Sequence, residues 1–148
     1  AKEMLKLSGI TDVDPRENLS NGKALEKWRE MIKAQGGDPD AALPKAEHWH
    51  VVRAKESGYV SSLEAISVGV ASWRLGAGRE RKEDAVQFGA GIEIHAQVGT
   101  AVKAGDPVMT LYTETPERFE RAIALAEEAI GISEREPAAR KLVLGRVS

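Results

Sequence analysis

Glycines and charged residues are concentrated in one short segment, RLGAGRERKEDAVQFGAGIEI, at residues 74–94. Gly76 and Gly78 come first, and a cluster of basic and acidic side chains follows them. A glycine-rich loop before a helix can bind phosphate, because the helix N-terminus offers free backbone N–H groups and the positive end of the helix dipole. The residues after this loop instead alternate like a strand, so the segment does not match that kind of phosphate site.

The three histidines are the next candidates for chemistry. His48 and His50 flank Trp49, and on a strand this spacing places both imidazoles on one face. Two histidines can begin a zinc or copper site, but no third ligand is evident nearby, so we predict no metal site. His95 falls on the polar side of an expected strand, where solvent or a surface hydrogen bond is more typical than a general base.

Residue patterns for covalent catalysis are missing from the sequence. There is no cysteine, which excludes disulfides, thiolate nucleophiles and cysteine-based metal sites in this chain. No serine lies in a nucleophile-elbow pattern, and no glycine loop ends in Lys-Ser or Lys-Thr. The many carboxylates, as in 114–128, are expected on solvated helix faces. We therefore predict no catalytic residue among the 148 residues.

Composition bounds the class of protein. A length of 148 residues suits one domain, or a small domain with a piece of another. Apolar residues make up 42% and charged residues 30%, as in soluble globular proteins. The net charge of −2 indicates neither nucleic acid nor an anionic membrane as a partner, and no apolar run approaches the roughly 18 to 20 residues of a membrane helix. We expect a cytoplasmic protein.

The first part of the chain reads as helical. Residues 1–9 resemble the last turns of a helix with Gly9 at its end, which favours a piece truncated from a longer protein. A turn-rich stretch follows at 11–22. Next comes an amphipathic helix, capped by Asn18 or Ser20 and ended by Gly36 and Gly37. Its apolar stripe has helical spacing and consists of Ala24, Leu25, Trp28, Met31 and Ile32.

The second part mixes short strands with two helices. Segment 36–47 is rich in Gly, Pro and Asp and is expected to be a linker. Strands are expected at 48–54, 57–62, 92–98, 107–113 and 141–148. Helices are expected at 63–75, with a stripe of Leu63, Ile66, Val70 and Trp73, and at 115–130, with a stripe of Phe119, Ala122, Ile123, Ala126 and Ile130. Because strands and helices do not alternate regularly, the class is α+β.

Several motifs follow one another in this second part: Ala54 with Ser57-Gly58-Tyr59-Val60, Leu75-Gly76-Ala77-Gly78-Arg79, Lys82-Glu83-Asp84 and Val102-Lys103-Ala104-Gly105-Asp106-Pro107. In this order they resemble the C-terminal domain of one family, the thymidine and pyrimidine-nucleoside phosphorylases. The upstream helix at 21–38 and the ending LVLGRVS are also similar to this family. The resemblance spans essentially the whole chain.

The resemblance implies a fold and a reaction. Residues 45–148 would form an α/β-hammerhead, or barrel-sandwich hybrid, domain, and residues 1–44 the helical end of the preceding α/β lobe with a linker. The family cleaves pyrimidine nucleosides with inorganic phosphate, giving the base and a pentose 1-phosphate, without a cofactor and as a homodimer. Its catalytic motifs lie upstream of Ala1, so the isolated segment is predicted to be inactive, with the rest of the phosphorylase chain as its partner.

The resemblance also gives the glycine-rich segment a role. In this family two lobes close over the substrate, and the loop is expected near the cleft between them. We therefore select six residues as a substrate-cleft loop: Gly76, Gly78, Arg79, Arg81, Lys82 and Asp84. The alternative is that Arg79 and Asp84 only brace a β-turn.

Two other functions stay open. A biotinyl or lipoyl carrier domain shares turns of this kind, but its modified lysine lies in Met-Lys-Met or Asp-Lys-Ala, which the sequence lacks; Lys55 and Lys103 are poor substitutes. A non-catalytic interaction module is the second alternative. Its motivation is the apolar stripe around Trp28, which in a fragment has lost the lobe that covered it.

Overall fold

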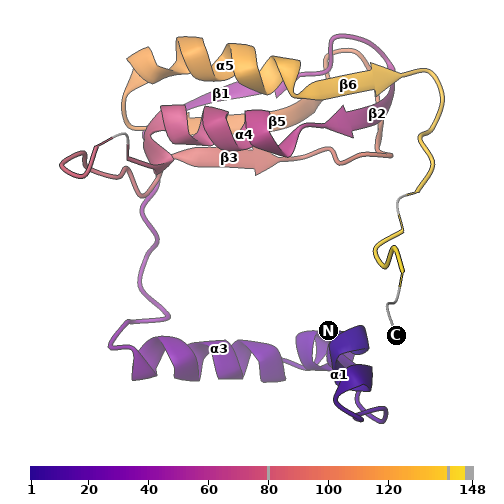
Figure 1. The fold of residues 1–148 in the computed structure, drawn as a ribbon. Helices are drawn as coiled ribbons and strands as arrows, with labels where there is room; N and C mark the ends of the chain where they lie inside the picture. The colour runs from indigo at the N-terminus through magenta and orange to yellow at the C-terminus, as the bar shows by residue number, and fades with distance from the viewer. Residues whose placement is uncertain (80, 140, 146–148) are drawn as a thin grey trace. The chain divides into compact units, whose positions relative to one another are not determined.

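The computed structural model describes residues 1–79, 81–139 and 141–145. The chain divides into two compact units, Ala1–Ala42 and Leu43–Ser148. Each unit is described by itself. Helices make up the first, and helices with two antiparallel sheets make up the second (Figure 1).

The first unit contains three helices, α1 (Lys2–Leu7), α2 (Pro15–Ser20) and α3 (Lys23–Ala34). The amphipathic pattern correctly predicted α3, and Gly36 ends it with a left-handed φ of 78°. Its N-cap is Gly22, so the prediction of Asn18 or Ser20 was wrong. Those two residues belong to α2, which occupies the stretch expected to be turns.

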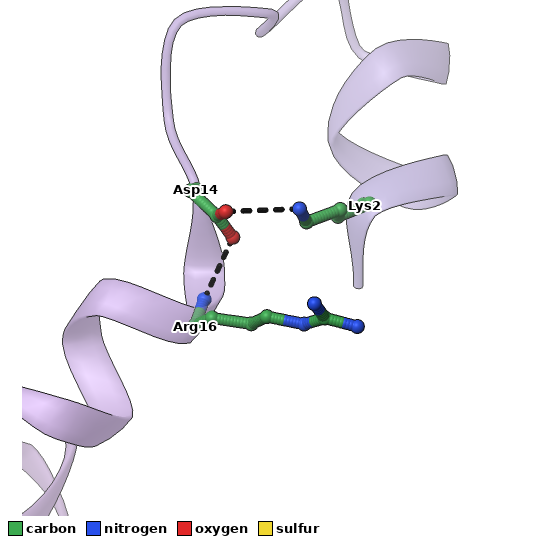
Figure 2. Close-up of polar contacts among 3 residues, drawn as sticks. All are labelled: Lys2, Asp14 and Arg16. Atoms are coloured by element: carbon green, nitrogen blue, oxygen red, sulfur yellow. Dashed lines mark hydrogen bonds and ion pairs between the residues drawn. The ribbon is translucent and has the colours of Figure 1, made fainter.

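Asp14 explains why α2 begins where it does. Its carboxylate accepts a hydrogen bond from the Arg16 N–H at 3.0 Å (Figure 2). Pro15 starts the helix with its preset φ. The other carboxylate oxygen accepts from the Lys2 ammonium of α1 at 2.9 Å. The Lys2 hydrogen bond, with that of Arg16 N–H, holds the pKa of Asp14 below its usual range. This capping signal was visible in the sequence as Asp-Pro.

Two three-stranded sheets form the second unit. In one sheet β5 (Pro107–Thr113) lies between β1 (His48–Arg53) and β3 (Gly91–Ile94), with both pairings antiparallel. In the other, β2 (Gly58–Leu63) lies between β4 (Ala101–Val102) and β6 (Ile130–Ser133), again antiparallel. The central strand β5 is buried over almost its whole length, which accounts for its run of apolar and β-branched residues.

Helices α4 (Ala65–Ser72) and α5 (Phe119–Glu128) pack against each other, and α5 also contacts β1 and β5 (Figure 1). A π-helical turn, η1 (Trp73–Ala77), continues α4, and a short 3-10 turn, η2 (Pro116–Arg118), opens α5. The core between the helices and the sheets is formed by side chains that include Leu75, Met109, Leu111, Ala122 and Ala126. The end of β5 lies beside η1, because Thr113 of β5 is hydrogen-bonded to Leu75 of η1.

Four details of the sequence prediction for this unit were wrong. Ile66 of α4 is 81% exposed, and the buried residue of that helix is Ala71, so the expected stripe was misplaced. Strand β3 ends at Ile94, before His95. Ile130 begins β6 and does not end α5. Residues 141–145 form no strand, and the last three residues of that expected strand lie outside the described residues.

The mixture of helices and antiparallel sheets confirms the α+β class. The hammerhead, or barrel-sandwich, architecture and the assignment of 1–44 to a neighbouring lobe stay predictions. Within the described residues, none of the helices has the length and apolar character needed to cross a membrane.

Candidate functional site

The glycine-rich segment forms a loop between Gly76 and Gln87 whose two ends are joined. The backbone N–H of Gln87 donates to the carbonyl of Gly76 at 2.9 Å, so the chain leaves η1 and returns to the same point, as in an Ω-loop. Gly76 has a φ of 110°, and a Cβ there would lie 2.8 Å from the Gln87 side-chain carbonyl carbon. Both the backbone conformation and the close approach require glycine at this position.

A polar cluster fixes the base of this loop to the end of β5. The hydroxyl of Thr113, which is fully buried, donates to the Leu75 carbonyl at 2.7 Å. The Gln87 side chain accepts from the backbone N–H of Glu114 at 2.9 Å and donates to the hydroxyl of Thr115 at 2.7 Å. The start and the end of the loop are thus both bound to residues 113–115, which lead into α5.

Trp73 supports the first part of the loop. Its indole N–H donates to the carbonyl of Arg79 at 3.0 Å. Gly78 lies against the indole ring, since a Cβ at this position would be 2.7 Å from the ring carbon Cδ1. The second glycine of the motif is therefore needed because the backbone passes close over an aromatic ring.

The charged residues further along the loop form a turn. The Asp84 carboxylate accepts from the backbone N–H of Arg81 at 2.8 Å, and the Asp84 N–H donates to the Arg81 carbonyl at 3.1 Å. The guanidinium of Arg79 lies 3.5 Å from the Lys82 carbonyl, a long contact. These contacts shape the turn. The residues Arg79, Arg81 and Lys82 are themselves exposed.

An open groove of about 1100 Å³ runs between this loop and the start of α5. Among the described residues, its lining carries equal numbers of basic and acidic side chains, namely Arg74, Arg81, Arg118, Arg121, Asp84, Glu114, Glu117 and Glu120. Two of the arginines also brace the backbone: Arg118 donates to the Arg74 carbonyl at 3.2 Å, and Arg74 donates to the Arg121 carbonyl at 3.4 Å. Balanced charge suits a protein surface of mixed charge better than a single phosphate.

The structure brings only part of the predicted loop set to the groove. Gly78, Arg81 and Asp84 line it, Gly76 is buried at the loop base, and Arg79 and Lys82 face each other across the turn. Sequence reasoning missed the polar residues that hold the loop, Trp73, Gln87, Thr113 and Thr115. No local signal marks them, because their partners lie 6 to 38 residues away along the chain.

The three histidines lie on or beside the β1–β5–β3 sheet, where His48 pairs in register with Thr113 at the base of the loop. His95 is exposed, and its Nε2 lies 2.7 Å from the hydroxyl of Thr110, a buried residue of β5. The hydrogen bond expected for His95 is therefore present, but it is partly buried. The ring of His50 lies 6.1 Å from that of Phe119 in α5. In the part of the chain that the structure describes, no group of three His, Asp or Glu residues is arranged to hold a metal ion.

The two lysines considered for a carrier domain have other surroundings. Lys55 pairs with Glu127 of α5 at 2.8 Å. Lys103 opens the turn before β5, where its backbone N–H donates to Asp106 at 2.8 Å. The geometry thus offers a braced loop beside a charged groove and gives the carrier alternative no support.

Known proteins resemble this chain over nearly its whole length. The chain is 43% identical to a thymidine phosphorylase of Mycobacterium tuberculosis over 147 residues, which is 99% of this chain and 34% of that protein. It is 41% identical over 132 residues to a pyrimidine-nucleoside phosphorylase of Bacillus subtilis, covering 86% of this chain and 30% of the relative. An AMP phosphorylase of Pyrococcus furiosus is 37% identical over 114 residues, covering 75% of this chain and 21% of the relative.

The chain thus spans about a third or less of the length of these curated relatives. Residues 59–133 match the family model described as the pyrimidine nucleoside phosphorylase C-terminal domain. That range contains β2 except for Gly58, together with α4, the Gly76–Gln87 loop, β5 and α5. On this evidence of sequence the chain belongs to the pyrimidine nucleoside phosphorylase C-terminal domain family.

Proposed function

We propose that this chain is the C-terminal part of a phosphorylase that transfers the pentose of a pyrimidine nucleoside to inorganic phosphate, releasing the base and a pentose 1-phosphate. One observation carries the proposal: 99% of the chain aligns, at 43% identity, with a relative named thymidine phosphorylase. This segment contributes structure and cleft closure. The groups that bind phosphate and nucleoside belong to the rest of the parent chain.

In this proposal, the loop between Gly76 and Gln87 contacts the second lobe when the cleft closes. Its base is bound to the end of β5, and its charged residues stand beside a groove of mixed charge. When a second lobe closes on such a surface, water is excluded from the cleft, which strengthens electrostatic interactions around the transferred sugar and holds the reactants in attack geometry. Arg79, Arg81 and Lys82 are exposed, and in this proposal they pair with that lobe.

The other parts of the proposal concern the assembled enzyme. Its partners are the rest of the phosphorylase chain, a pyrimidine nucleoside and inorganic phosphate, and it uses no cofactor. It works in the cytoplasm as a homodimer whose contacts lie mainly outside these 148 residues. Sedimentation of the complete parent chain tests the homodimer, and a dimer is the expected result. The 148-residue chain by itself need not dimerise.

The decisive experiment measures phosphorolysis of thymidine and uridine by two proteins, the 148-residue chain and the complete parent chain. We expect release of thymine or uracil, dependent on phosphate, from the complete chain and none from the segment. Turnover by the segment alone would place catalytic groups inside it and overturn the assigned division of roles. An inactive complete chain would overturn the proposed reaction.

A further inference from the structure

We infer that Gln87 is a positioning residue of the phosphorylase: its side chain latches the Gly76–Gln87 loop to the end of β5, so that the loop meets the opposite lobe as a preformed surface. This inference rests on the proposed function. Gln87 is neither a glycine of the motif nor one of the charged residues of the loop, yet it aligns the loop.

The hydrogen bonds fix both the position and the orientation of the Gln87 amide. Its Oε1 lies 2.9 Å from the backbone N–H of Glu114, and its Nε2 lies 2.7 Å from the Thr115 hydroxyl. A flipped amide would place an NH₂ group against the Glu114 N–H, so the network selects one orientation. Gln87 thus uses its acceptor and one donor on two consecutive residues at the end of β5.

Burial of the neighbours strengthens this latch. Leu75 and Thr113 are fully buried, Gly76 is buried, and Gln87 itself is half-buried. The bond from Thr113 to the Leu75 carbonyl is buried and the bond from Gln87 to Thr115 is partly buried, whereas the bond from the Glu114 N–H to Gln87 is exposed. The first two are strengthened by shielding from water, and the Leu75 carbonyl would be costly to leave without a partner. Glycine at position 76 makes room for the Gln87 side chain, since a Cβ there would lie 2.9 Å from its Oε1. The first glycine of the motif therefore serves the latch.

The latch joins three segments at one point. The Gln87 N–H donates to the Gly76 carbonyl, and the Thr113 hydroxyl donates to the Leu75 carbonyl. The Gln87 side-chain amide accepts from the Glu114 N–H and donates to the Thr115 hydroxyl. The start of the loop, its end and the approach to α5 are thus held together. A loop fixed in this way loses little conformational entropy when the lobes close, so more of the contact energy is available for closure.

The test uses the complete parent chain with Gln87→Leu, which keeps the size of the side chain and removes its donor and acceptor. The loop itself supplies a readout, because trypsin cleaves after Arg79, Arg81 and Lys82. In the native state we expect cleavage at these three bonds to become about tenfold faster, because cleavage follows local opening. Turnover should fall about tenfold, with kcat decreasing more than KM increases.

Three further variants complete the experiment. Gln97→Leu makes the same chemical change at an exposed glutamine and should alter neither cleavage nor kcat. Gln87→Glu keeps the acceptor for the Glu114 N–H, and the Thr115 hydroxyl can rotate to donate to it, so it should restore most of the lost turnover. If Gln87→Leu does not fold, Thr115→Val removes only the partner of Nε2 and gives the smaller effect in the same direction.

The outcomes separate the latch from the proposed reaction. Unchanged cleavage in both Gln87→Leu and Thr115→Val would overturn the latch. Faster cleavage with unchanged kcat and KM in an active enzyme would overturn the positioning role. A wild-type parent chain without phosphorolysis would overturn the proposed function, while the cleavage comparison still decides whether Gln87 holds the loop.

Discussion

The backbone carbonyl and the side chain of Arg79 make different contacts. Its backbone carbonyl accepts the Trp73 indole N–H at 3.0 Å, whereas its guanidinium lies 3.5 Å from the Lys82 carbonyl, a long contact. Removing the side chain therefore leaves the stronger structural bond in place. On the proposed function, the charge at this position serves closure.

For this reason we predict that Arg79→Ala in the complete parent chain lowers kcat by about tenfold or more, the usual scale for losing a charged hydrogen bond. Its melting temperature should stay that of the wild type. Arg135→Ala removes another exposed arginine outside the loop and serves as the control in both assays. Equal turnover in wild type and Arg79→Ala would show that this arginine only shapes the turn.

The Asp14 carboxylate is a second residue whose surroundings predict a measurement. The Lys2 hydrogen bond lowers its pKa, so the stabilisation it gives to α2 is present above the ordinary carboxyl range and is lost as the pH falls through the lowered pKa. In NMR titration, Lys2→Ala should raise the Asp14 pKa toward its ordinary value. Lys6→Ala removes the same charge from a lysine of α1 paired with Glu3, and should leave it unchanged. Equal shifts in both variants would indicate a general charge effect.

At the scale of elements, the contact between α4 and α5 depends on small side chains. Ala71 of α4 is fully buried, as are Ala122 and Ala126 of α5. Alanine at these positions lets the helices approach closely, and helix α5 then covers β1 and β5. Because η1 continues α4 and the loop follows η1, this packing also sets the place from which the loop begins.

We therefore expect Ala126→Leu to lower the free energy of unfolding by about 1–3 kcal/mol, the cost of overpacking a filled core. Ala124→Leu makes the same change two residues earlier on an exposed side of the same helix and should alter stability by less than about 0.5 kcal/mol. Urea denaturation measures both. Similar losses in the two variants would show that the helix contact is not the cause.

For the whole molecule, the apolar face of α3 is the feature that points beyond these 148 residues. Its side chains Leu25, Trp28 and Met31 are 53%, 45% and 47% exposed, and the helix has no buried residue. The chain spans 34% of the thymidine phosphorylase of Mycobacterium tuberculosis, so most of a parent chain of that length lies outside it. On the proposed function, that remaining chain covers this face.

This gives a prediction for Trp28 that needs no loop variant. With fluorotryptophan incorporated, ¹⁹F NMR resolves the three tryptophans, and Trp28→Phe assigns the signal. The solvent isotope shift of Trp28 should be smaller in the complete parent chain than in the 148-residue chain. The urea-unfolded chain gives the fully exposed reference. The same shift in both native proteins would mean that the face remains open in the parent.

Sequence alone determined the features that depend on near neighbours. Periodicity located α3, β1 and α5, Pro107 and the preceding turn located β5, and motif order indicated the family that the comparisons confirmed. Tertiary structure decided which side of α4 is buried, where β3 ends and what holds the loop. The physical reason is distance along the chain: Thr113 meets Leu75 38 residues away, and Gln87 meets Thr115 28 residues away. Such hydrogen bonds exist only once β5 and η1 are brought together by the packed core.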